Sequence, residues 1–241
     1  MVYSASGPGG SLPRSGDFLY NDDMDVAARL LVFDLDGTLI DSKVDLANAV
    51  NVALESFDLP PLPNALIYTY VGDGATLLIR RALPPEKAGF LPEVLERFLS
   101  YYRNHLLDTT RPYPGVVDTL RKWSGMYRMA VLTNKGLAMT EAILSGLSLL
   151  PYFFEVRGGD SFENKKPHPQ GLIHILREAG AAPREAVMVG DSRNDILAGR
   201  AAGTVTCGVT YGLGTEGFAE APPDFTVDSF PELFRRLRPA E

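Results

Sequence analysis

The sequence predicts an α/β fold in which a doubly wound, mostly parallel, Rossmann-like sheet carries an inserted small α-helical cap domain. Short, fully apolar runs recur along the chain, which is typical of strands buried on both faces of a parallel sheet. Helical patterns separate these runs, and this alternation is the order of a doubly wound sheet. One stretch, residues 43–110, shows helical patterns without a convincing strand, so we expect it to be the insert.

Residues 1–27 are predicted to form a flexible N-terminal extension. The first 23 residues are rich in Gly, Ser and Pro and show no apolar period, and they also fit an upstream segment before a start at Met24. The apolar core of a secretory signal is missing from residues 1–23, and their acidic residues make a transit peptide the weaker alternative. The single cysteine, Cys207, suits a reducing compartment, and we expect a cytoplasmic protein.

Short apolar runs are the expected strands of the core domain, which we assign to residues 28–42 and 111–241. The runs cover residues 31–33, 129–132, 153–156, 187–189, 205–209 and 225–227. Apolar residues that recur every three or four positions predict helices between the strands. These helices cover residues 116–123, 137–147, 169–179, 196–202 and 231–237.

The insert at residues 43–110 is expected to fold as a small helical domain. Apolar residues recur at helical spacing in its first part, at Ala47, Val50, Leu54 and Phe57. A proline-rich segment ends this helix, and residues 75–82 and 91–107 are again helical. The run Ser-Lys-Val-Asp at residues 42–45 fits a capping box at the start of the first helix.

The charge balance excludes some partners. The chain has 23 Lys and Arg against 30 Asp and Glu, a net charge of −7. Non-specific nucleic-acid binding needs a basic face, and adhesion to an anionic membrane needs basic residues, so we expect neither partner. Apolar runs also stay well short of the ~20 residues that a membrane helix requires. We expect a monomer or a homodimer that acts on a small molecule.

The most informative cluster, residues 34–38, follows the first apolar run. Asp34 and Asp36 lie two positions apart, so both carboxylates can face one site at the end of the strand. In open α/β sheets, ligands bind outside the carboxyl ends of the strands. Paired carboxylates suit Mg²⁺, and a carboxylate beside such a cation can accept a phosphoryl group. A solvated turn explains Asp36 and Gly37, but it does not explain Asp34, which directly follows three apolar residues.

Polar residues also stand beside later strands and helices of the predicted fold. Thr133 and Asn134 end the second run, where a hydroxyl can bond an anionic oxygen, although such a pair is more often a helix cap. Lys165 and Lys166 stand just before a proline that holds the backbone near the next helix. A lysine fixed there can neutralise a phosphoryl group or pair with Asp34, although a lysine pair is usually solvated surface.

The last cluster combines two further carboxylates. Asp191 ends an apolar run and Asp195 lies one helical turn on, so both can reach the same cation. The alternative is that Asp191 or Ser192 caps the following helix. Carboxylates, a hydroxyl and a lysine at the ends of separate strands are what phosphoryl transfer requires, namely positioning and neutralisation of charge.

These clusters resemble the four-motif signature of the haloacid-dehalogenase-like phosphatase superfamily. The matching residues are Asp34-Leu35-Asp36-Gly37-Thr38-Leu39, Thr133, Lys166-Pro167 and Gly190-Asp191-Ser192 with Asp195. The resemblance in fold covers roughly residues 28–238, and the insert resembles the cap domain of one subgroup. Within that subgroup, the runs similar to phosphoglycolate phosphatase are residues 70–75, 80–83, 113–116 and 158–160.

The resemblance implies a role for each motif residue. Asp34 is the expected nucleophile and forms an aspartyl-phosphate, while Asp36 is the expected general acid and base. The dehalogenases lack this second carboxylate, so halide chemistry is disfavoured. Thr133 and Lys166 are expected to hold the phosphoryl oxygens, and Lys166 is preferred over Lys165 because it directly precedes the proline.

The implied cofactor is Mg²⁺. The resemblance places on it the carboxylate of Asp34, the backbone carbonyl of Asp36 and the carboxylate of Asp191. Asp195 is expected to contribute through water or as a support. The implied reaction is hydrolysis of a small anionic phosphomonoester, with 2-phosphoglycolate, which gives glycolate and phosphate, as the first expectation.

Substrate choice is expected to depend on the insert. Gly74 belongs to a glycine loop that can approach a small substrate, and Asn134 lies beside the expected phosphoryl contact. Arg80 or Arg81 is a candidate for a substrate carboxylate, because arginine binds carboxylates with two parallel hydrogen bonds. The alternative is that both arginines lie on a solvated helix face.

Other functions stay open at this point. The same residues fit a sugar-phosphate mutase, or a phosphatase for sugar phosphates, nucleotides or pyrophosphate, and a non-catalytic binding module is the weaker alternative. Residues 212–217 match the dinucleotide pattern G-x-G-x-x-G, but they lie outside an opening βαβ unit and are disfavoured as a cofactor site. Cys207 lies in an apolar strand and is expected to be buried and inert.

Overall fold

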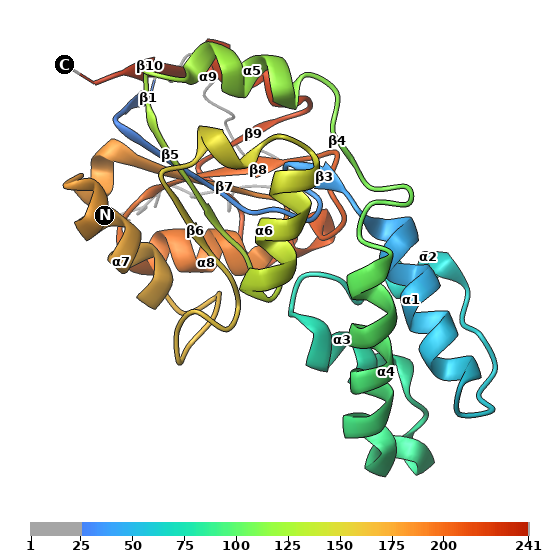
Figure 1. Cartoon of the computed structure of the whole chain (residues 1–241). Coiled ribbons are helices and arrows are strands. Elements are labelled where there is room, and N and C mark those ends of the chain that lie inside the picture. The colour runs from blue at the N-terminus through green and yellow to red at the C-terminus, as the bar shows by residue number, and fades with distance from the viewer. Residues whose placement is uncertain (1–25, 241) are drawn as a thin grey trace, which may run out of the picture.

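A six-stranded parallel sheet forms the centre of the molecule, as the apolar runs predict (Figure 1). The computed structural model describes residues 26–240. The strand order is β6-β5-β2-β7-β8-β9, and every neighbouring pair is parallel. The strands are β2 (Leu30–Phe33), β5 (Arg128–Leu132), β6 (Glu155–Arg157), β7 (Ala186–Gly190), β8 (Val205–Val209) and β9 (Phe225–Val227). The predicted doubly wound fold is therefore confirmed.

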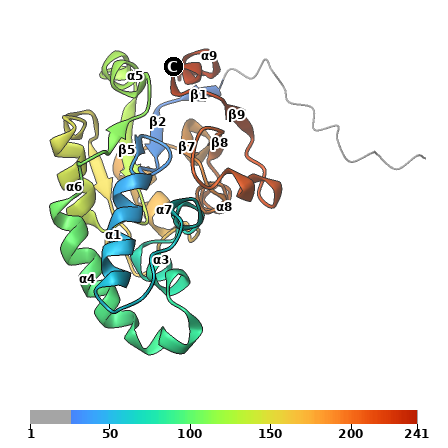
Figure 2. The same ribbon diagram turned by 90° about the vertical axis from the view of Figure 1, so that its right-hand side faces the viewer.

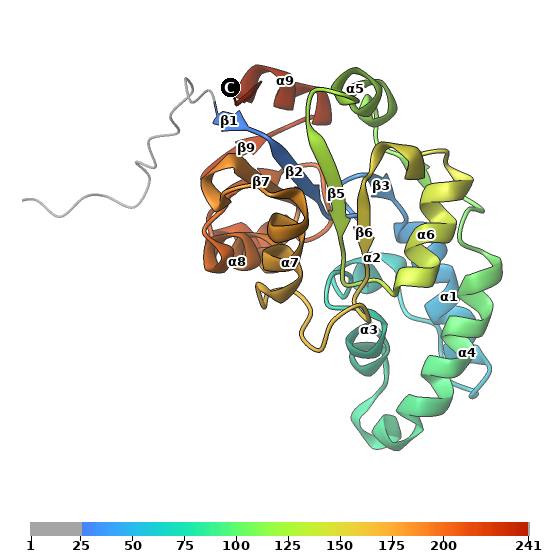
Figure 3. The same cartoon turned by 60° about the vertical axis from the view of Figure 1, so that its left-hand side comes forward.

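Helices cover both faces of this sheet, because its central strands bury side chains on both. They are α5 (Val116–Trp123), α6 (Leu137–Gly146), α7 (Gln170–Ala179) and α8 (Arg193–Ala202). On the face covered by α5 and α6, Phe33 packs against Trp123 and Phe230, with ring centroids 6.5 and 5.6 Å away. Helices α7 and α8 cover the other face (Figure 3), where Val32 and Ile175 belong to one buried apolar cluster. Full burial of one such side chain contributes about 1.5–3 kcal/mol.

Two short sheets close the ends of the fold. β1 (Val26–Ala28) pairs in parallel with β10 (Leu237–Pro239), and β3 (Ile40–Asp41) pairs antiparallel with β4 (Arg111–Pro112). The prediction of a flexible extension to residue 27 is wrong at its end, because residues 26 and 27 belong to β1. The rest of that expected extension lies outside the described residues. The helix expected at residues 231–237 is shortened to η5 (Phe230–Glu232) and α9 (Leu233–Arg236), since Leu237 is in β10.

The chain between β3 and β4 forms the helical insert, which projects from one end of the sheet (Figures 1 and 2). Its elements are α1 (Lys43–Glu55), α2 (Asn64–Tyr68), α3 (Ala75–Ala82), η1 (Pro85–Phe90) and α4 (Leu91–Asn104). α1 and α4 lie side by side, and their buried residues recur at helical spacing, as at Val50 and Leu54 or Val94 and Phe98. Across residues 26–240, no helix combines the length and apolar character that crossing a bilayer requires.

The expected capping box at residues 42–45 is wrong, although α1 does begin at Lys43. Ser42 makes no side-chain cap bond, and its Oγ donates to the Asp36 carboxylate instead. The Asp45 carboxylate accepts hydrogen bonds from the backbone N–H and hydroxyl groups of Thr109 and Thr110. These partners come from the segment that leaves the insert, so Asp45 ties the two ends of the insert together.

Candidate active site

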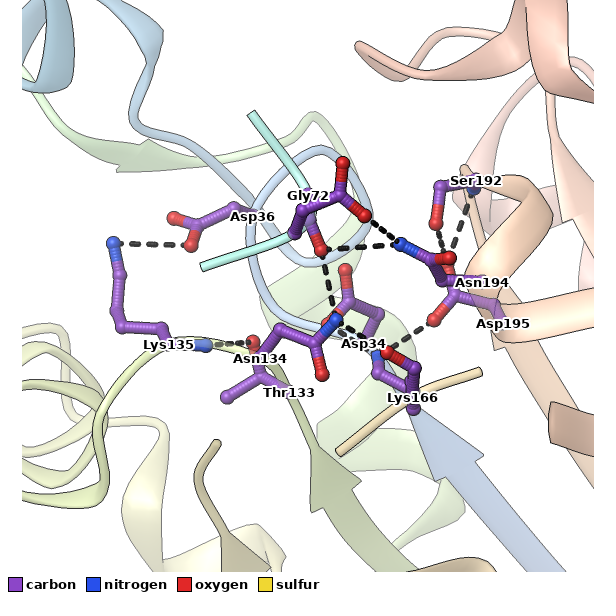
Figure 4. A network of polar contacts seen from close by, with 11 residues as sticks. Asp34, Asp36, Gly72, Thr133, Asn134, Lys135, Lys166, Ser192, Asn194 and Asp195 are labelled. Carbon is purple, nitrogen blue, oxygen red and sulfur yellow. Dashed lines mark hydrogen bonds and ion pairs between the residues drawn. The ribbon is translucent and has the colours of Figure 1, made fainter. Parts of the chain in front are cut away.

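The carboxyl ends of three adjacent strands bring the predicted polar residues to one place. Figure 4 shows Asp34, Thr133 and Lys166 among them. The last residues of β2 are in register with those of β5 and β7. The residues that follow these strands, Asp34, Thr133 and Asp191, therefore emerge at one edge of the sheet. Asp34 is anchored there by its backbone N–H, which donates to the carbonyl of Val189 at 2.9 Å. All three side chains are buried.

Three buried carboxylates meet at this edge. Asp34, Asp191 and Asp195 each offer an oxygen that lies within 4.8 Å of the others. Burial raises the pKa of Asp34 to about 6, and burial together with the neighbouring carboxylates raises the pKa of Asp191 well above its usual value. One lysine cannot neutralise three carboxylates, so two negative charges stay uncompensated when all are ionised. Such a group of oxygen donors with excess charge fits a hard divalent cation.

The loop after β8 orients Asp191. The backbone N–H groups of Leu213 and Gly214 donate to Asp191 Oδ2 at 2.6 and 3.2 Å. Neither bond uses Oδ1, and no hydrogen bond to Oδ1 is found within residues 26–240. A Cβ at Gly212 or Gly37 would overlap the Asp191 carboxyl group, and Gly37 also has a φ of +84°. Gly212 and Gly214 of the pattern at residues 212–217 are therefore explained by their contacts with Asp191, and the second half of the pattern lies in the short 3₁₀ helix η4 (Thr215–Ala219).

Lys166 joins two of the carboxylates. Its Nζ lies 2.8 Å from Asp34 Oδ1 and 2.6 Å from Asp195 Oδ1. Burial alone would lower the pKa of Lys166, but the charges of Asp195 and Asp34 outweigh burial and raise it. The second oxygen of Asp195 accepts from the N–H and hydroxyl of Ser192. Both oxygens of Asp195 therefore already have hydrogen-bond partners. This favours the expectation that Asp195 positions Lys166 over the expectation that it binds the metal directly.

Asp36 faces a different set of partners. Its carboxylate lies 3.0 Å from Lys135 Nζ and accepts a hydrogen bond from Ser42, and it is not part of the group formed by Asp34, Asp191 and Asp195. The role that the resemblance gives to its backbone carbonyl stays a prediction. Lys135 had no assigned role in the sequence, although it directly follows Thr133 and Asn134. Its position just after a buried strand is the signal that points to it.

A cavity lies between the strand ends and the insert. Polar residues of the core line one side, namely Asp34, Asp36, Thr133, Asn134 and Lys135. Apolar residues of the insert line the other, namely Leu46, Val71, Ala75, Leu78 and Phe98. The expected nucleophile and general acid therefore open into one cavity whose far wall is mostly apolar.

Of the substrate contacts expected in the insert, the structure places one at the cavity and one outside it. Gly74 lines the cavity, whereas Arg80 is exposed and lies outside the lining. Arg81 pairs with Asp73 at 2.5 Å. The Asn134 amide donates to the carbonyl of Gly72 at 2.9 Å, so this residue holds the glycine loop against the core.

Core residues hold the same loop at two further points. Asn194 Nδ2 donates to Asp73 Oδ1 at 2.7 Å, and Lys165 Nζ donates to the Asp73 carbonyl. Lys165 therefore contacts the insert, whereas Lys166 contacts the buried carboxylates. This difference supports the preference for Lys166 as the phosphoryl contact.

Comparison with known proteins adds independent evidence. The family model of the haloacid dehalogenase-like hydrolases matches residues 31–209. A phosphoglycolate phosphatase from Haemophilus influenzae is 40% identical over 225 residues, which cover 89% of this chain and 100% of that protein. Phosphoglycolate phosphatase 1 from Pseudomonas aeruginosa is 40% identical over 213 residues, or 85% of this chain and 78% of that protein.

Solved structures agree with these matches. The crystal structure of a predicted phosphoglycolate phosphatase from Haemophilus somnus superposes with a TM-score of 0.80 at 33% identity, over 86% of this chain and 97% of that one. A haloacid dehalogenase-like family protein from Streptococcus pneumoniae gives a TM-score of 0.77 at 24% identity, over 86% and 97% of the two chains, and shows the shared fold. The family match runs from β2 to the end of β8 and includes every strand end that carries the carboxylates. The chain therefore belongs to the haloacid dehalogenase-like hydrolase family.

Proposed function

We propose that this hydrolase removes phosphate from 2-phosphoglycolate, with Mg²⁺ as its metal. It is a phosphoric monoester hydrolase, in agreement with its family and its relatives. The observation that carries the proposal is the buried group of Asp34, Asp191 and Asp195, with Lys166 paired to Asp34, beside a cavity that Asp34 lines. The choice of substrate is supported by relatives named phosphoglycolate phosphatase at about 40% identity.

Asp34 is the nucleophile in this mechanism. Its Oδ1 is held by Lys166, which leaves Oδ2 to attack the phosphorus of the ester. The bond from phosphorus to the substrate's alcohol oxygen breaks as the aspartyl-phosphate forms. Burial raises the pKa of Asp34 to about 6, so at pH 7 the carboxylate is mostly ionised and retains high basicity.

Asp36 supplies the proton transfers. In its protonated form it gives a proton to the departing alcohol oxygen, and the resulting carboxylate then removes a proton from the water that attacks phosphorus. This attack breaks the bond from phosphorus to Asp34 and releases inorganic phosphate. The carboxylate lines the same cavity as Asp34, which places both groups within one enclosed space. This role requires Asp36 to turn from Lys135 and Ser42 toward the leaving oxygen.

Charge at the phosphoryl group is balanced by the core. Lys166 and the hydroxyl of Thr133 hold its oxygens, and Asp195 fixes the lysine from the other side. Asp34, Asp191 and the carbonyl of Asp36 would hold the metal. When bound, a divalent cation offsets the negative charge shared by these carboxylates and the phosphoryl oxygens.

The helical insert, residues 43–110, acts as a cap in this proposal, and residues 28–42 and 111–241 form the core. The loop of the insert at residues 72–74 accepts hydrogen bonds from Asn134, Asn194 and Lys165 of the core. The cap supplies the apolar wall that keeps bulk water from the aspartyl-phosphate.

A substrate screen with two matched variants tests the proposal. Phosphate release is measured for 2-phosphoglycolate, sugar phosphates, nucleotides and pyrophosphate, with and without Mg²⁺. We expect 2-phosphoglycolate to have the highest kcat/KM, chelation to stop turnover, and Mg²⁺ to restore it. Asp34→Asn should abolish turnover, while Asp118→Asn, an exposed residue of α5, should not change it. Turnover by the Asp34 variant near the normal rate would contradict the assigned nucleophile.

A further inference from the structure

Lys135 is a buried cation that the four family motifs do not use. Its side chain is 5% exposed, and its Nζ contacts two groups, Asp36 Oδ2 at 3.0 Å and the Tyr102 hydroxyl at 2.8 Å. Tyr102 comes from α4 of the insert, so Lys135 stands where core and insert meet. We propose that Lys135, together with Tyr102, binds the carboxylate of the substrate. This inference rests on the proposed function and deepens it.

Unused hydrogen-bond donors support this assignment. A lysine ammonium has three N–H donors, and within residues 26–240 only two acceptors are found for Lys135. Tyr102 accepts a hydrogen bond from Lys135, and its own O–H has no acceptor among the described residues. Burial raises the pKa of Tyr102 to about 12, so the hydroxyl keeps its proton. Both side chains line the cavity and can offer one further donor each.

The surroundings select for an anion at this point. Lys135, on the core side, is the one cation among the described residues that line the cavity, and the insert side of the lining is mostly apolar. A neutral group that displaced its partners would leave a buried charge unpaired, which is costly. A carboxylate would satisfy both Lys135 and Tyr102. Exposed Arg80 has no place in this lining, so the cap arginine is not needed to recognise the carboxylate.

The spacing suits a very small substrate. Lys135 lies two residues after Thr133, so their Cα atoms are at most about 7.6 Å apart. In 2-phosphoglycolate, one methylene carbon and the ester oxygen separate the phosphorus from the carboxylate carbon. A phosphoryl group at Thr133 therefore leaves the carboxylate in the neighbourhood of Lys135.

The proposal also explains the present pairing of Lys135 with Asp36. Asp36 must leave Lys135 and take up a proton from solvent before it can protonate the leaving oxygen, and a buried lysine needs another anion when this happens. The substrate carboxylate can take that place. An acidic substrate would then free Asp36 for catalysis, whereas a neutral substrate would have to separate a buried ion pair without replacing it.

The test compares two substrates of nearly equal size, 2-phosphoglycolate and 2-hydroxyethyl phosphate, which carries a neutral CH₂OH group in place of the carboxylate. The readout is the ratio of their kcat/KM values, because a general loss of Asp36 function lowers both values and cancels in the ratio. We expect Lys135→Met to lower the ratio by about 100-fold and Tyr102→Phe by about tenfold. Lys122→Met, an exposed lysine of α5, should leave the ratio unchanged.

The outcomes separate this inference from the proposed function. If the wild type prefers 2-phosphoglycolate and Lys135→Met keeps the same kcat/KM ratio, the role of Lys135 is overturned and the proposed function stays intact. Wild-type protein without preference for the acidic substrate would overturn both. Circular dichroism and thermal melting check the fold of each variant. If Lys135→Met does not fold, an unchanged ratio in Tyr102→Phe overturns the proposed carboxylate site.

Discussion

Asp45→Asn should destabilise the protein, because Asp45 links the first helix of the insert to the segment that returns to the core. The Asp45 carboxylate is 2% exposed and accepts hydrogen bonds from the N–H and hydroxyl groups of both Thr109 and Thr110, at 2.6–3.0 Å. An amide keeps one acceptor oxygen and turns an NH₂ group toward buried donors. A buried donor left unsatisfied costs about 1–3 kcal/mol, so we expect a loss of about 2–3 kcal/mol. For a chain of this size that corresponds to a melting temperature lower by about 4–12 °C.

The loss should depend on pH with a definite sign. Burial alone would raise the pKa of Asp45, but the hydrogen bonds from Thr109 and Thr110 outweigh burial and lower it. A pKa below the unfolded value of about 3.9 contributes stability that is fully present above that value. The contribution disappears as pH falls through the lower, folded pKa. The difference between wild type and Asp45→Asn should therefore be constant from pH 7 to 5 and shrink below pH 4.

Urea unfolding of both proteins at pH 7, 5 and 3.5 measures this difference. The matched control is Asp41→Asn, because Asp41 makes an ion pair with Lys43 in which the side chains are 34% and 35% exposed, and the pair should contribute less than about 1 kcal/mol. Equal stability of wild type and Asp45→Asn at pH 7, or a difference that does not change with pH, would refute the role given to this carboxylate.

The remaining predictions concern the candidate active site. Lys166→Met should lower kcat/KM by about 10³-fold, because it removes the buried cation that faces the phosphoryl group, whereas Lys165→Met should cost less than about tenfold in the same steady-state assay. Gly37→Ala should weaken metal binding by about 10–100-fold, as titration calorimetry with Mg²⁺ can measure, since the new Cβ displaces the carboxylate of Asp191. Unchanged affinity would show that this contact is unimportant. Arg80→Ala should change the kcat/KM for 2-phosphoglycolate by less than about twofold, and a larger loss confined to acidic substrates would return Arg80 to the site.

The central sheet was predictable because its signal is local. A strand buried on both faces must be apolar over several consecutive residues, as residues 30–33 are, and this pattern is visible in the sequence alone. Parallel strands also end at one edge of the sheet. Polar residues that directly follow such runs, including Asp34, Thr133 and Asp191, can therefore be expected to meet.

The sequence-based predictions were wrong where a contact with distant residues replaces the local contact that the pattern indicates. The run at residues 42–45 has the composition of a capping box, yet Asp45 is bound by Thr109 and Thr110, which are 64 and 65 positions away. Residues 26 and 27 looked like part of a flexible tail because their strand partner, β10, lies at the other end of the chain. Arg80 stays a prediction as a carboxylate contact, but its exposed position outside the cavity lining favours the alternative of a solvated helix face.

Residue type and spacing within a short window are enough to predict the parallel sheet, the helical insert, and the carboxylates and lysine at the strand ends. Which side chains meet depends on the packing of distant segments. Lys166 reaches Asp34 across 132 residues, and Lys135 reaches Tyr102 across 33, from core to insert. The physical reason is that an ion pair depends on where two segments pack, and no local pattern records the position of a distant partner.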